Sequence, residues 1–63
     1  MNPRYALCRG GAHDNERWPL ERNASPGHTF AWDDLGRTVT YAVVPEIVET
    51  NRGPMWVATP MAA

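Results

Sequence analysis

The chain has 63 residues, enough for one small domain, and its six basic residues stand against seven acidic ones. The net charge of −1 argues against a non-specific nucleic-acid binder, because such proteins carry a basic excess. A single cysteine excludes an internal disulfide, and no run approaches the roughly 20 apolar residues that a membrane-spanning helix needs. We therefore expect one domain over residues 1–63, without a membrane segment, in a reducing cytoplasm.

Turn-forming residues divide the chain into short runs, and this spacing is typical of strands. Six prolines and the lack of a helical period over three turns argue against long helices. The predicted fold class is all-β, or β-rich: a small antiparallel meander or open barrel of five to six short strands. The predicted turns lie at Gly10–Gly11, Asp14–Asn15, 23–27, 33–36 and 51–54.

The first half of the chain predicts two short strands joined by a tight turn. Residues 4–9 alternate as a strand. A turn follows at residue 15, because asparagine tolerates the left-handed backbone conformation. Residues 17–21 form the second strand, which we expect at an edge of the sheet because Pro19 cannot donate a backbone hydrogen bond. The two faces of the first strand are Tyr5 with Leu7, and Ala6 with Cys8.

Two further strands are predicted over 28–32 and 37–44, separated by a turn or a single helical turn at 33–36. The strand over 37–44 is rich in β-branched and aromatic residues, which suit a half-buried sheet. It carries no proline and no acid, so it must be covered on both sides or pair with another chain. Because so small a sheet has few strands to cover it, we expect a homodimer or larger assembly. In the first of these strands His28, Phe30 and Trp32 share one face, and in the second Val39, Tyr41 and Val43 share one face.

The end of the chain predicts a hairpin over 46–59. Pro45 is expected to interrupt the preceding strand, and a three-residue loop over 51–53 ends in glycine, a common hairpin connection. A loose tail is expected from about residue 60. The register that follows from this loop places Val48 opposite Trp56, and Ile47 opposite Val57.

The order of these features resembles a set of small proteins from actinobacteria and especially their phages. Residues 5–16 carry the strand, Gly-Gly-x-x-Asp turn and second short strand with which those proteins open. The tyrosine-bearing segment 41–44 and the hairpin segment 52–57 are also similar. Ala12 stands where that family often has proline, and Asn15 where it often has glycine, and both suit a turn. The resemblance implies a phage-type accessory gene product in the cytoplasm of a host cell.

Four residues could in principle ligate a metal. They are Cys8, His13, Asp14 and His28, but their spacing lacks the paired ligands of structural zinc sites. We expect a buried cysteine and two surface histidines. The acidic residues at 33–34 and at 46 and 49 show no feature that would desolvate one of them for acid–base chemistry. The sequence therefore predicts no metal, no cofactor, no catalytic residue and no enzyme.

The aromatic residues allow two interpretations, a core or an interface. Three tryptophans are hard to hide in so thin a domain, and Trp, Tyr and Arg are enriched at the centres of protein interfaces. Trp18 is the strongest candidate for exposure because it neighbours Pro19, and Trp56 is the candidate core member. The candidate interface residues are Trp18, Trp32, Arg17 and Tyr41.

We expect from these observations a small phage-type accessory protein that binds a host cytoplasmic protein and catalyses nothing. The main alternative is a structural protein that self-assembles in many copies, for instance in a virion. A small nucleic-acid-binding β-barrel with aromatic stacking platforms is a third possibility, which the charge disfavours.

Overall fold

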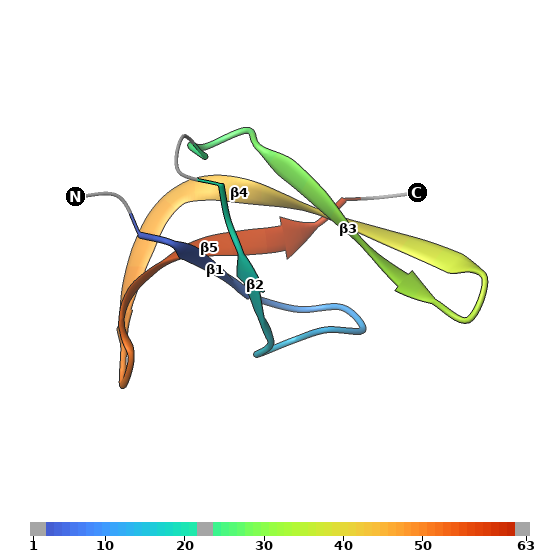
Figure 1. Cartoon of the computed structure of the whole chain (residues 1–63), viewed down its shortest axis with the longest axis horizontal. Coiled ribbons are helices and arrows are strands. Elements are labelled where there is room, and N and C mark those ends of the chain that lie inside the picture. Colours follow the sequence, from blue (N-terminus) through green and yellow to red (C-terminus); the bar gives the residue numbers. More distant parts are fainter. Residues whose placement is uncertain (1–2, 22–23, 62–63) are drawn as a thin grey trace.

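A computed structural model describes residues 3–21 and 24–61 of the chain, and it is all-β (Figure 1). The described residues form no helix, so the predicted fold class is confirmed. None of their elements is a helix long and apolar enough to cross a lipid bilayer. The strands are β1 (Tyr5–Cys8), β2 (Arg17–Pro19), β3 (Thr29–Asp34), β4 (Arg37–Thr50) and β5 (Gly53–Pro60).

The five strands make one sheet in the order β2-β1-β5-β4-β3, curled into a half-barrel (Figure 1). Consecutive strands β1 and β2, β3 and β4, and β4 and β5 pair antiparallel. β1 and β5 run parallel, with Ala6 opposite Trp56. The predicted meander is wrong at this point, because the first strand enters between β2 and β5 and the sheet is mixed. The predicted edge position of Pro19 is confirmed, since β2 ends the sheet.

β4 is a long, bent strand that continues through Pro45, where the sequence predicted an interruption. The pairing with β5 shifts between Val44 and Ile47, and this irregularity accommodates the proline. The predicted three-residue loop is also wrong, because Gly53 pairs with Thr50 and only two residues form the turn. The observed register is therefore displaced by one residue, with Val48 opposite Met55, Ile47 opposite Trp56, and Val44 opposite Val57.

In the segment 37–44, which was expected to need a second chain, β3 pairs with residues 37–42 and β5 pairs with residues 41–44. Each side of this segment is thus paired only in part within the chain, and the expected homodimer or larger assembly stays a prediction. The tail also differs from expectation, because Pro60 still belongs to β5 and the Met61 amide donates to the Thr40 carbonyl oxygen at 2.8 Å. Residues 62–63, and Asn23 of the predicted loop 23–27, lie outside the described residues.

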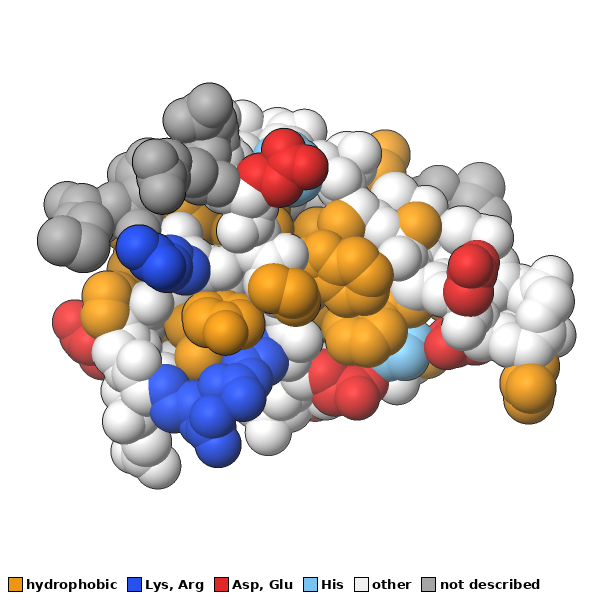
Figure 2. Space-filling model, in the orientation of Figure 1, with side chains coloured by type: hydrophobic (Ala, Val, Ile, Leu, Met, Phe, Trp, Pro, Cys, Tyr) orange, Lys and Arg blue, Asp and Glu red, His pale blue; other side chains and the backbone are white. Residues whose placement is uncertain are grey.

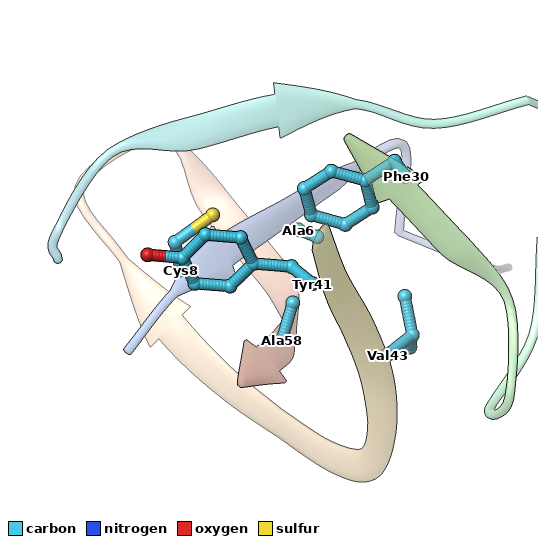
Figure 3. Close-up of a cluster of buried hydrophobic side chains, with 6 residues drawn as sticks. All are labelled: Ala6, Cys8, Phe30, Tyr41, Val43 and Ala58. Carbon is cyan, nitrogen blue, oxygen red and sulfur yellow. The ribbon is translucent and has the colours of Figure 1, made fainter. Parts of the chain in front are cut away.

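The core fills the inner face of the half-barrel (Figure 3). Tyr41 is 0% exposed and lies at its centre. The alternation predicted for the first strand is confirmed, because Ala6 and Cys8 are buried while Tyr5 is exposed and Leu7 half-buried. Trp56, the predicted core member, is half-buried and packs against this core. The buried cluster consists of Ala6, Cys8, Phe30, Tyr41, Val43 and Ala58.

Candidate functional site

Aromatic rings connect the two ends of the sheet across the open side of the half-barrel. Trp18 of β2 stacks on Phe30 of β3, with ring centroids 5.0 Å apart, and meets Trp32 edge-on at 4.7 Å. Phe30 in turn stacks on Tyr41 at 5.9 Å. We call Trp18, Phe30, Trp32 and Tyr41 the aromatic ladder. Such aromatic pairs stabilise a fold by more than the area that they bury. The aromatic ladder therefore holds β2 and β3 together, although the two strands are not hydrogen-bonded neighbours in the sheet.

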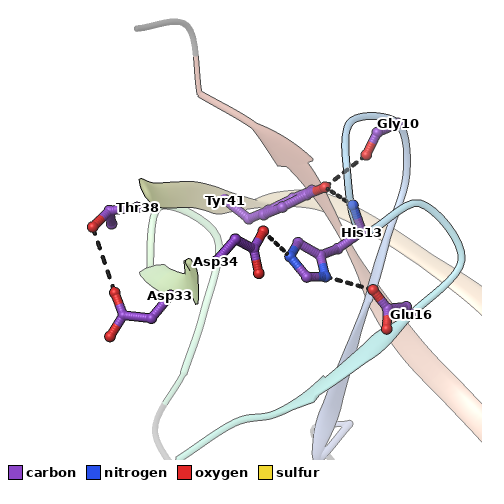
Figure 4. A network of polar contacts seen from close by, with 7 residues as sticks. All are labelled: Gly10, His13, Glu16, Asp33, Asp34, Thr38 and Tyr41. Atoms are coloured by element: carbon purple, nitrogen blue, oxygen red, sulfur yellow. Dashed lines mark hydrogen bonds and ion pairs between the residues drawn. The ribbon is translucent and has the colours of Figure 1, made fainter. Parts of the chain in front are cut away.

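The loop between β1 and β2 is attached to the ladder through Tyr41 (Figure 4). The Tyr41 hydroxyl donates to the Gly10 carbonyl oxygen at 2.8 Å and accepts from the His13 amide at 3.0 Å. Gly11 allows this approach, because a β-carbon there would lie 2.8 Å from the Tyr41 hydroxyl oxygen. Asn15 has φ of 70°, as the sequence predicted. Gly10 and Gly11 thus serve a turn, which was the expected role.

His13 lies between two carboxylates from different parts of the chain (Figure 4). Its Nδ1 is 2.5 Å from Glu16 Oε2, and its Nε2 is 2.6 Å from Asp34 Oδ2. One face of the imidazole stacks on Trp32 at 4.0 Å. The side chain is 13% exposed, so the predicted surface histidine is in fact largely covered. Both ring nitrogens can donate to both acids only in the imidazolium form.

The electrostatic consequence for His13 is a raised pKa. Burial disfavours the charged imidazolium and lowers the pKa, but the hydrogen bonds to Asp34 and Glu16 and their negative charges outweigh this and raise it. The pKa of the Cys8 thiol is also raised, because burial disfavours the charged thiolate. A thiol held in this state is a poor nucleophile.

The other candidate ligands and acids are dispersed. Among the described residues, no three His, Cys, Asp or Glu side chains lie in a group that could hold a metal ion. Of the acids considered for acid–base chemistry, Asp34 binds His13 and Glu46 forms an ion pair with Arg9 at 3.0 Å. The Cys8 thiol is packed in the core.

Three of the four predicted interface residues, Trp18, Trp32 and Tyr41, belong to the aromatic ladder, whereas Arg17 lies outside it. Trp18 and Trp32 are half-buried members of the ladder, and Arg17 is exposed on β2 with its guanidinium carbon 5.2 Å from the centroid of the Tyr5 ring. Tyr41 is fully buried, so its assignment to an interface is wrong: its ring fills the core and its hydroxyl anchors the loop. Figure 2 shows hydrophobic side chains gathered on one face, beside arginines at one end and a histidine with acids at another.

The outer edge of β3 is a feature that the sequence analysis missed. The Val43 amide donates to the His28 carbonyl oxygen at 2.8 Å, so this pair is hydrogen-bonded. Because bonded and non-bonded pairs alternate in an antiparallel ladder, Thr29, Ala31 and Asp33 turn their backbone groups away from β4. β3 ends the sheet, and no described strand pairs with that side. The sequence feature that could have indicated this free edge is the absence of proline in 28–34, in contrast to Pro19 in the other edge strand.

Comparisons of the chain with models of protein families, with curated proteins and with solved structures find no match. The resemblance to small actinobacterial and phage proteins therefore stays a prediction, and the site is interpreted from its own geometry.

Proposed function

We propose that the protein is a non-catalytic binding module whose partner adds an extended segment to the outer edge of β3. One observation carries this: the edge strand has three residues, Thr29, Ala31 and Asp33, whose backbone groups face away from the sheet. Natural sheets usually protect such an edge from pairing with proline, a bulge or a covering segment. An edge without this protection is a template for strand addition.

The composition of this edge supports a specific contact. The side chains of Thr29 and Ala31 are small and exposed, which favours the approach of an incoming strand. Asp33 and Asp34 place negative charge at the far end, which restricts how another chain can align. Phe30 and Trp32, whose side chains alternate with these, fix β3 onto the core through the ladder, so the edge is held rigid before binding.

The partner class is a protein of the bacterial cytoplasm, as the resemblance to phage accessory proteins implies. A second copy of the chain is the alternative partner, because an edge strand can pair with its own symmetry mate. In that case the protein would be a self-assembling structural component, and the same edge would form the contact.

Ala31→Pro tests the proposal. Proline at this position removes the outward N–H and places its ring on the free side, while the bonds to β4 belong to residues 30 and 32. Ala31→Thr, which retains the N–H, is the matched control. Partners captured from bacterial lysate by the wild type are purified and titrated against both variants. We expect at least about tenfold weaker binding by Ala31→Pro, because one backbone hydrogen bond is lost and the proline ring obstructs the incoming strand, and wild-type affinity for Ala31→Thr.

Equal affinity of Ala31→Pro and the wild type would contradict the use of this edge. Sedimentation of the wild type alone distinguishes the alternative partner. Self-association that Ala31→Pro abolishes and Ala31→Thr retains would assign the edge to a second copy of the chain in place of a host protein.

A further inference from the structure

A second potential site lies on the outer face of β1 and β5, away from the elements that form the β3 edge. Leu7 pairs with Arg17 on one side and with Val57 on the other, so these three side chains share a face of the sheet. Met55 follows on the same face, two residues before Val57. An open hollow of about 500 Å³ lies here, and Leu7 and Met55 give it an apolar floor.

Two arginines from different elements border this hollow. Arg17 projects from β2, where its guanidinium lies 5.2 Å from the Tyr5 ring centroid, a distance typical of a cation–π contact. Arg52 lies in the β4–β5 turn, whose geometry is fixed because the Thr50 hydroxyl accepts from the Arg52 amide and donates to the Gly53 carbonyl oxygen. Within residues 3–21 and 24–61, neither guanidinium forms an ion pair or a hydrogen bond.

The acid at this hollow is already engaged. Glu16 borders it, but its carboxylate is bound to the largely covered imidazole of His13 at 2.5 Å. The remaining polar side chains that line the hollow are uncharged, and they belong to Asn15, Thr50 and Asn51. The hollow therefore presents two guanidinium groups that have no ion-pair partner among the described residues, next to the apolar side chains of Leu7 and Met55. Figure 2 shows arginine side chains gathered beside hydrophobic ones at one end of the molecule.

We propose that this hollow binds an oxyanion, a carboxylate or a phosphate, that is carried by an apolar group. A guanidinium offers two parallel donors that match the oxygens of either anion. Leu7 and Met55 would contact the apolar portion, while the amides of Asn15 and Asn51 add hydrogen-bond donors at the rim. The inference is independent of strand addition at β3, because it uses β1, β2, β5 and the β4–β5 turn.

The test is an NMR titration of the chain, labelled with ¹⁵N and with ¹³C at the methionine methyl groups, with four probes: acetate, N-acetylleucine, inorganic phosphate and phenyl phosphate. We expect saturable shifts of the Arg17 and Arg52 Nε–H signals and of the Met55 methyl group. The probe with an apolar portion should bind about fivefold or more tightly than the bare anion, because it buries additional apolar surface. Saturation by only one pair of probes would identify the anion as carboxylate or phosphate.

Arg52→Gln and Arg17→Gln should each weaken binding at least about tenfold, by analogy with other charge-assisted hydrogen bonds. Arg52 lies in an exposed turn, so its variant reports on the ligand even if loss of the Arg17–Tyr5 contact disturbs the fold. Arg37→Gln, which removes an exposed arginine outside the hollow, is the matched control and should bind as the wild type does. No saturable shift with any probe, or equal binding by all three variants, would overturn the proposal.

Discussion

The imidazole of His13 stacks on the indole of Trp32, with the ring centroids 4.0 Å apart and the planes 9° from parallel. His13 belongs to the loop between β1 and β2, whereas Trp32 belongs to β3 at the other end of the sheet. The contact therefore closes the half-barrel beside the Trp18–Phe30 stack. A cation over an indole face is attractive, and the two carboxylates on the imidazole favour that cation.

The free energy of unfolding should fall as the pH rises from about 6 to 8.5. The pKa of His13 is raised in the folded state, so its protonated form is favoured by folding. This contribution is complete below the ordinary histidine pKa of about 6.5 and is lost as the pH rises through the folded-state value. Urea unfolding at a series of pH values measures this pH dependence of the free energy of unfolding. The sign follows because, in this range, the folded state binds more protons than the unfolded state.

His13→Gln should remove most of this pH dependence, since glutamine does not titrate. His28→Gln is the matched control, because His28 makes no ion pair with any described residue. A pH profile that stays steep in His13→Gln, or one that rises toward pH 8.5 in the wild type, would show that the imidazolium does not hold Asp34 and Glu16 together.

Gly11→Ala should lower the free energy of unfolding by about 2–4 kcal/mol. Gly11 has φ of +73°, where an L residue is strained by about 1–2 kcal/mol. The new β-carbon would also lie 2.8 Å from the Tyr41 hydroxyl oxygen and 3.3 Å from Pro60. Tyr41 is packed in the core and cannot move away freely, so overpacking adds to the backbone strain. Thermal and urea unfolding give the difference.

Gly36→Ala is the control for this prediction. Gly36 has φ of +83°, and a β-carbon there would meet nothing within 4 Å. We expect Gly36→Ala to lower the free energy of unfolding only by the cost of backbone strain, about 1–2 kcal/mol. Equal losses at both positions would show that the Tyr41 contact does not restrict residue 11.

Local patterns in the sequence were sufficient to predict much of the fold. Alternation at 4–9 and 37–44 predicted which residues share a face of each strand, and Pro19 identified an edge strand, because these features depend on single residues or neighbours. The parallel pairing of β1 with β5 was not predictable in this way. It joins residues that are 50 positions apart, Ala6 and Trp56, and nothing local determines it. The bulge beside Pro45 was missed because proline was interpreted as a break in the strand.

The polar site was less accessible to sequence reasoning. Glu16 is three residues from His13, so a local contact could have been suggested. Asp34 is 21 residues away, and it reaches His13 only because the curled sheet brings β3 toward the β1–β2 loop. Tyr41 was assigned to an interface because aromatic residues are enriched there, but in this chain the core needs its volume and the loop needs its hydroxyl.

Leu35→Asn should stabilise the protein by roughly 0.5–1 kcal/mol. Leu35 and Gly36 form the two-residue turn between β3 and β4, with φ of 48° and 83°. This geometry favours asparagine before glycine. The leucine side chain is 107% exposed, so no packing is lost. Leu35→Val is the control and should destabilise, because β-branched residues tolerate positive φ poorly. A lower melting temperature for Leu35→Asn than for the wild type would contradict the prediction.

The Cys8 thiol should react with a disulfide reagent at least about a hundredfold more slowly in the native protein than in urea, because reaction requires opening of the core. Cys8 is 1% exposed, and burial raises the pKa of its thiol, so both access and thiolate fraction are reduced. A variant that combines Cys8→Ala with Ala12→Cys is the control, since residue 12 is exposed in the loop. Its thiol should react at nearly the same rate with and without urea. Native labelling of Cys8 as fast as that of the control would mean that the half-barrel opens readily between β1 and the aromatic ladder.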